Sequence, residues 1–194
     1  MQLNLYLISH PIIQKLASDV SYDHKYTSPN INNYKYKNLG LLMIYEVVRK
    51  YIKTEKIHIK AIDCIEEFCI LSQEVSCLIL ADIKKSYSII SDITWIFPEI
   101  HIQPIYFSIN ENILNQSDIK NKIKSINGKK IILLMQSHLD DYSSIEILDY
   151  LTKYEKINIE SIRIVCITCD NQIIGKIGKK YPKLTMYASK VTDN

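Results

Sequence analysis

Two kinds of apolar spacing alternate along the chain, one typical of helices and one typical of strands. Helical spacing predicts helices over residues 11–20, 37–52, 86–97, 144–154 and 172–181. Strict alternation over 57–62 predicts a strand with one covered face, and the continuous apolar run 77–81 predicts a strand buried on both faces. Further strands are expected over residues 100–107, 131–135, 161–168 and 184–188. This order predicts an α/β fold with a mostly parallel, twisted sheet flanked by helices.

The 194 residues are expected to form a single domain over 1–194, long enough to bury a full core. The polar segment 21–36 shows neither spacing and is predicted to be an exposed loop. The apolar share of 47% and the charged share of 23% are those of globular proteins. The net charge is only +3, and the lysines stand among acids, so neither a membrane nor a nucleic acid is the expected partner.

The composition changes the expected location of the protein. Ile, Asn, Lys and Tyr are abundant, and only Arg49 and Arg163 are arginines among the 24 basic residues. AT-rich codons supply these residue types, and the first residues resemble neither a secretory signal nor a transit peptide. We therefore predict a plastid (chloroplast) protein that works where it is made, with the cytoplasm as the alternative.

Five cysteines, an odd number, are expected to be reduced thiols. Cys166 and Cys169 have the spacing of half a zinc site, but the second such pair is missing and Cys166 lies within the predicted strand 161–168. We therefore predict that these two residues are thiols of the core, and we predict no metal ligand.

Ligands of open α/β sheets bind at the carboxyl ends of the strands. The loops after Ala81, Met135 and Thr168 are therefore the candidate sites. Residues 130–148 have the strand, loop and helix order of a phosphate-binding turn.

Several segments resemble uracil phosphoribosyltransferases in order and spacing along nearly the whole chain. The matching segments are SHPII at 9–13, LGLLMIYE at 39–46, TEK at 54–56, FP at 97–98, SINE at 108–111, and YP at 181–182 ahead of LTMY at 184–187. The resemblance implies a phosphoribosyltransferase-like fold, usually dimeric, that joins uracil to phosphoribosyl pyrophosphate and makes UMP. It also implies Mg²⁺ as the cofactor if phosphoribosyl pyrophosphate is still bound.

The family's main phosphate loop reads Asp-Pro-Met-Leu-Ala-Thr-Gly-Gly-Ser, and residues 135–143 of this chain read MQSHLDDYS. Met135 stands where the family's Asp holds the ribose hydroxyls. Asp140, Asp141 and Tyr142 stand where a Thr and two Gly let backbone N–H groups surround the 5′-phosphate. A carboxylate about 4 Å from a phosphate charge costs on the order of 4 kcal/mol at an effective dielectric near 20. The resemblance therefore implies weakened phosphate binding.

Helix capping is the alternative role of the same loop. Asp141, Ser143 or Ser144 could cap the helix that follows, and Ser143 with Glu146 fits a capping box.

The family's second segment, Arg-Ala-Gly-Leu-Gly, holds pyrophosphate and corresponds to KKSYS at 84–88. Lys84 keeps a positive charge but lacks the two-pronged geometry of Arg, and Ser86 and Ser88 replace the two glycines. The family's Gly-rich tail that encloses uracil has no match before Asn194, so the domain is expected to lack it.

We therefore predict a uracil phosphoribosyltransferase homologue whose catalysis is lost or severely weakened, with no catalytic residue assigned. Lys84, Ser86, Ser143 and Ser144 are predicted as remnants of the phosphate-binding loops. The predicted partner is a second copy or a related chain. A non-catalytic nucleotide- or RNA-binding regulator on the same fold, and a decaying gene product, are the alternatives.

Overall fold

The computed structural model describes residues 3–26, 33–72, 74–97, 100–107, 113–126 and 129–193. Its main sheet consists of β1 (Asn4–Leu7), β4 (Val75–Asp82), β5 (His101–Ile105), β6 (Lys129–Leu139), β7 (Ile162–Asp170) and β8 (Thr185–Thr192). These six strands lie in the order β1-β8-β7-β6-β4-β5, and all neighbours pair in parallel. The predicted α/β fold with a mostly parallel sheet is confirmed.

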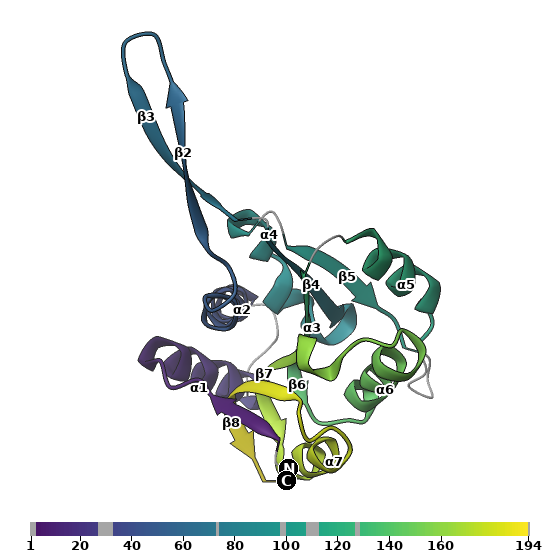
Figure 1. Ribbon diagram of the computed structural model, residues 1–194. Coiled ribbons are helices and arrows are strands. Elements are labelled where there is room, and N and C mark those ends of the chain that lie inside the picture. Colours follow the sequence, from purple (N-terminus) through teal and green to yellow (C-terminus); the bar gives the residue numbers. More distant parts are fainter. Residues whose placement is uncertain are drawn as a thin grey trace.

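Helices cover both faces of this sheet (Figure 1). One layer contains α1 (Pro11–Tyr26), α2 (Asn33–Val48), α3 (Ile83–Ile90) and α4 (Ile93–Ile96). The other contains α5 (Gln116–Ser125), α6 (Ser143–Asp149) with a π-helical turn over Tyr150–Tyr154, and α7 (Asn171–Lys180). A 3₁₀ turn over Ile159–Ser161 leads into β7. No helix of the described residues combines the length and the apolar character that a membrane span requires.

Each face of the sheet carries its own apolar core. Along β4, Leu78 and Leu80 pack in the core beneath α5, α6 and α7, whereas Ile79 and Ala81 pack in the core beneath α1, α2 and α3. Successive side chains of a strand point to opposite faces, so a strand covered on both faces needs apolar residues throughout. The predicted burial of the run 77–81 on both faces is confirmed.

The predicted loop over 21–36 is wrong at both ends. Helix α1 continues through Tyr26 and α2 already begins at Asn33, while residues 27–32 lie outside the described residues. Ser21 donates its hydroxyl to the Ala17 carbonyl within α1 (2.7 Å), and Tyr36 of α2 is partly buried, so both residues belong to helices and not to a loop. The predicted helix 86–97 is also interrupted, because α3 ends at Ile90 and α4 begins at Ile93.

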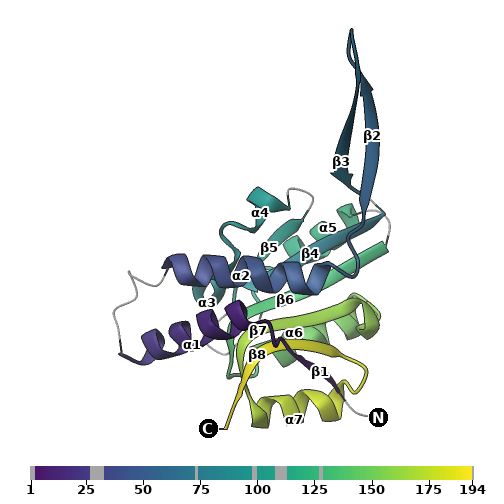
Figure 2. The same cartoon turned by 90° about the vertical axis from the view of Figure 1, so that its left-hand side faces the viewer.

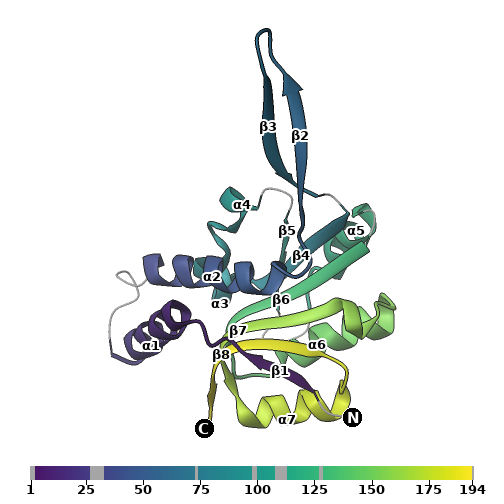
Figure 3. The same cartoon turned by 60° about the vertical axis from the view of Figure 1, so that its left-hand side comes forward.

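A hairpin of β2 (Thr54–Lys60) and β3 (Ile65–Leu71) projects from the body of the molecule (Figures 1, 2 and 3). The predicted strand 57–62 therefore starts earlier and ends at Lys60. Its predicted covered face is wrong for the single chain, since every residue of β2 is exposed. The sequence patterns also missed β1, β3 and α5.

Candidate functional site

A hollow of about 180 Å³ lies where β4, β5 and β6 end. Its lining residues are Asp82, Lys84, Lys85, Tyr106, Phe107, Asp141 and Ser143. The carboxyl ends of neighbouring parallel strands are where open α/β sheets bind ligands. The fold thus brings together two of the three candidate segments, the one after Ala81 and the one after Met135.

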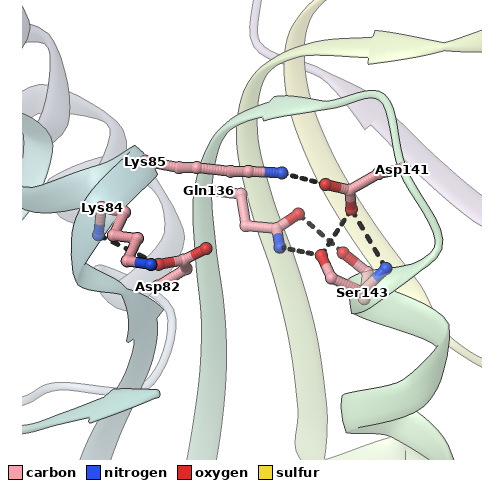
Figure 4. Close-up of polar contacts among 7 residues, drawn as sticks. Asp82, Lys84, Lys85, Gln136, Asp141 and Ser143 are labelled. Atoms are coloured by element: carbon pink, nitrogen blue, oxygen red, sulfur yellow. Dashed lines mark hydrogen bonds and ion pairs between the residues drawn. The ribbon is translucent and has the colours of Figure 1, made fainter. Parts of the chain in front are cut away.

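The carboxylate of Asp141 lies between Lys85 and Ser143 (Figure 4). One of its oxygens forms an ion pair with Lys85 Nζ, at the start of α3. The other accepts the backbone N–H of Ser143 (3.0 Å) and the Ser143 hydroxyl. The side chain of Asp141 therefore engages both a cation and a helix N–H group, the two kinds of donor that a phosphate would need here.

The ion pair shifts the pKa of both partners. Burial alone would raise the pKa of Asp141, but the bonds from Lys85 and Ser143 outweigh it and hold this pKa below its ordinary value. Burial would likewise lower the pKa of Lys85, but the Asp141 bond and the charges of Asp140, Asp141 and Asp82 hold it above its ordinary value. Both groups are therefore charged near neutral pH, and the two carboxylates that line the hollow balance its two lysines.

A buried network of polar side chains on β6 supports the ion pair of Lys85 and Asp141. The Gln136 amide, only 3% exposed, donates to the Ser143 hydroxyl (3.3 Å) and accepts from the Ser144 hydroxyl (2.6 Å). Ser137 donates its hydroxyl to the Lys85 carbonyl (2.6 Å). Strand β6 is thereby fixed to the starts of both α6 and α3, so Lys85 and Asp141 are held on facing elements.

The four predicted remnant residues lie at two depths. Lys84 and Ser143 line the hollow. Ser86 is completely buried, and its hydroxyl has no hydrogen-bond partner among the described residues. Ser144 is buried as well, and its hydroxyl is directed to Gln136. The structure therefore brings two of the four residues to the hollow and places the other two behind it.

Asp141 stabilises the start of α6, because its side chain accepts the N–H of Ser143, but it does so from one residue before the N-cap, which is Tyr142. The predicted capping box is wrong. Ser143 is itself the first helical residue, and the Glu146 carboxylate instead accepts the backbone N–H of Ile113 (3.2 Å).

The loop after Thr168 does not join the hollow. Strand β7 continues to Asp170, and the Thr168 hydroxyl lies 2.6 Å from Nδ1 of His138 on β6. Cys166 and Cys169 are buried, so the prediction of core thiols is confirmed. Contact with Cys169, together with burial, raises the pKa of Cys166 well above its ordinary value. The described residues contain no group of three or more His, Cys, Asp or Glu side chains arranged to hold a metal.

The sequence analysis missed Asp82, Gln136 and Ser137. Asp82 directly follows the buried run 77–81 and precedes a helix, which is the position of an N-cap. In the structure its side chain accepts the backbone N–H of Lys84 (3.0 Å). The signal for Asp82 was therefore present, whereas no local pattern distinguishes Gln136 and Ser137 from other residues of a buried strand.

We expect Asp82→Ala to lower the free energy of unfolding by about 1 kcal/mol or more, because it removes the cap of α3 at a position only 7% exposed. Urea denaturation measures this loss. Asp140→Ala is the control, since Asp140 is an exposed acid near the same hollow and its loss should change stability by less than about 0.5 kcal/mol. Equal effects of the two changes would contradict the capping role.

Proteins of similar sequence align with nearly the whole of this chain. It is 27% identical to the uracil phosphoribosyltransferase homologue of Porphyra purpurea, over the whole chain and 92% of that protein. It is 24% identical to the homologue of the same name from Pyropia yezoensis, again over the whole chain and 91% of that protein. The uracil phosphoribosyltransferase of Metamycoplasma hominis is 26% identical over 93% of this chain and 84% of that protein. The chain therefore resembles the uracil phosphoribosyltransferases and their homologues over nearly its whole length.

The fold of this chain is shared with a solved structure, the AQ2163 protein of Aquifex aeolicus. The TM-score is 0.72, and the match covers 98% of this chain and 88% of the other at 16% identity. The predicted phosphoribosyltransferase-like fold is confirmed. No family model matches the chain.

Proposed function

We propose that this uracil phosphoribosyltransferase homologue has lost, or retains only severely weakened, formation of UMP from uracil and phosphoribosyl pyrophosphate. The observation that carries the proposal is the Asp141 carboxylate bound to Lys85 and to the N–H of Ser143. The protein's own anion thus engages a cation and a helix N–H group in the loops where the family resemblance places substrate phosphate.

A phosphate entering the hollow would have to displace Asp141 from both partners. The carboxylate of Asp141 would then face the phosphate, at a cost on the order of 4 kcal/mol at about 4 Å and an effective dielectric near 20. Solvent reduces this cost, because the Lys85 side chain is 45% exposed. Even half of this cost corresponds to about a thirtyfold loss of affinity.

The ribose side of the site supports the same proposal. Met135 stands where the family places a ribose-binding Asp, and its side chain is buried in the core beneath α1, α2 and α3. A thioether in that position cannot accept hydrogen bonds as a carboxylate would. Ser86, in place of a family glycine, is likewise part of the packed interior of α3 and not of an open backbone turn.

An assay of labelled uracil conversion to UMP, with millimolar phosphoribosyl pyrophosphate and Mg²⁺, tests this proposal. The uracil phosphoribosyltransferase of Metamycoplasma hominis, assayed in parallel, provides the active reference. We expect this chain to turn over at least about 1,000-fold more slowly, equivalent to a barrier about 4 kcal/mol higher. Turnover within about tenfold of the reference would refute the proposal.

A further inference from the structure

The hollow at the ends of β4, β5 and β6 is lined by charges of both signs. Its carboxylates are those of Asp82 and Asp141, and its ammonium groups are those of Lys84 and Lys85. Lys85 and Asp141 form an ion pair with each other, so one cation and one anion lie side by side in its wall. A ligand that binds here without leaving either of these two groups unpaired must therefore carry one charge of each sign.

A simple anion does not meet this condition. It competes with the Asp141 carboxylate for Lys85, and the two anions then repel each other. A simple cation competes with Lys85 for Asp141 in the same way. An α-amino acid instead offers a carboxylate to Lys85 and an ammonium group to Asp141. Because one carbon atom carries both groups, the opposite charges of the ligand are adjacent, as are those of Lys85 and Asp141.

The two members of the ion pair differ in their freedom to move apart. Asp141 is held by the backbone N–H of Ser143 (3.0 Å) and by the Ser143 hydroxyl, and only 20% of its side chain is exposed. Lys85 has a long, flexible side chain that is 45% exposed. The Lys85 ammonium group can therefore move aside to admit a ligand, while Asp141 stays in place and remains bound to Ser143.

Aromatic side chains form another part of the wall. Tyr106 and Phe107 directly follow β5 and line the hollow. Phe107 forms a β-bridge with Ile113 and packs against the core beneath α5, α6 and α7. The Asn115 side chain accepts the backbone N–H of Tyr106 (3.1 Å). These contacts hold two aromatic rings near the charged groups, where they can cover an apolar side chain of a ligand.

We propose that this hollow binds a free α-amino acid with an apolar side chain. The carboxylate of the amino acid pairs with Lys85, and its ammonium group pairs with Asp141. Its side chain packs against Tyr106 and Phe107. The hollow measures about 180 Å³, below the roughly 300–1,000 Å³ of sites for drug-sized ligands, and suits such a small molecule. This proposal rests on the proposed weak binding of phosphate, because a tightly bound phosphate would occupy the same lysine.

Calorimetric titration of the full chain with L-leucine tests the amino-acid site. We expect saturable binding with a Kd of about 1 mM or below. The matched control ligands each lack one charged group of leucine: 4-methylpentanoate has no ammonium group, and 3-methylbutylamine has no carboxylate. Each should bind at least about tenfold more weakly, because it leaves Asp141 or Lys85 without a partner. No saturable heat from leucine up to about 10 mM, or equal affinity for leucine and either control, would overturn the proposal.

Asp141→Asn distinguishes this proposal from the proposed loss of catalysis. The variant should bind leucine at least about tenfold more weakly, because the ligand ammonium group loses its anionic partner. Asp140→Asn is the matched control, since Asp140 is an exposed acid of the same loop, and it should change the leucine affinity by no more than about twofold. Unchanged leucine affinity in Asp141→Asn would overturn the amino-acid site. Saturable binding of phosphoribosyl pyrophosphate by the wild-type chain would instead contradict the proposed loss of catalysis.

Discussion

Gly40→Ala is expected to destabilise the fold by about 3 kcal/mol, near the upper end of the range for overpacked cores. A Cβ atom at Gly40 would overlap the carbonyl oxygen and the Cγ2 atom of Ile89, so α2 and α3 would have to separate. The carbonyl belongs to backbone that cannot rotate away, and Ile89 is only 1% exposed. Urea denaturation of the wild-type and variant proteins measures the difference.

Gly175→Ala is the matched control for this prediction. Gly175 lies within α7, and among the described residues its added Cβ would have no atom within 4 Å apart from its chain neighbours and the backbone of its own helix. Alanine in a helix interior is favoured over glycine by about 0.5–1 kcal/mol, so this variant should gain stability. If Gly40→Ala were as well tolerated as Gly175→Ala, the close approach of α2 and α3 would be incorrect.

Asp141→Asn is expected to raise the affinity for phosphoribosyl pyrophosphate by about tenfold or more, because it removes the charge that neutralises Lys85. Asparagine caps helices about as well as aspartate, so the N–H of Ser143 should keep its partner and the fold its stability. The rise in Tm with phosphoribosyl pyrophosphate and Mg²⁺ reports the affinity.

Asp140→Asn provides the control for charge alone. Asp140 is an exposed acid beside the same loop, and its charge acts on Lys85 only through space. We expect Asp140→Asn to change the affinity by no more than about twofold. If the affinity of both variants rose equally, the affinity would depend on the net charge of the loop and not on the ion pair of Asp141.

The sequence predicts the strands that are buried on both faces, and it misses elements whose burial depends on few residues. The runs 77–81 of β4 and 131–135 of β6 are apolar throughout because both faces are covered. The apolar spacing does not predict helix α5, because only Ile119 and Ile123 of its ten residues are buried. Alternation along β2 correctly indicates a strand, but it also predicts a covered face, whereas every residue of β2 is exposed.

The candidate site was only partly predictable, for a different reason. Lys84 and Ser143 were expected at a phosphate-binding hollow and both line one. The ion pair between Lys85 and Asp141 joins residues 56 positions apart, and it depends on the parallel register in which Ala81 lies beside Met135. No local pattern contains that register. The plastid location and the extent of the domain remain predictions from the sequence.

Calorimetric titration of the wild-type protein with phosphoribosyl pyrophosphate in the presence of Mg²⁺ tests most directly whether Asp141 has taken the place of the substrate phosphate. With Lys85 and the N–H of Ser143 already engaged, no saturable heat of binding is expected at sub-millimolar ligand. Saturable binding with a sub-millimolar Kd would show that the phosphate displaces Asp141 readily, and would contradict the proposed loss of function.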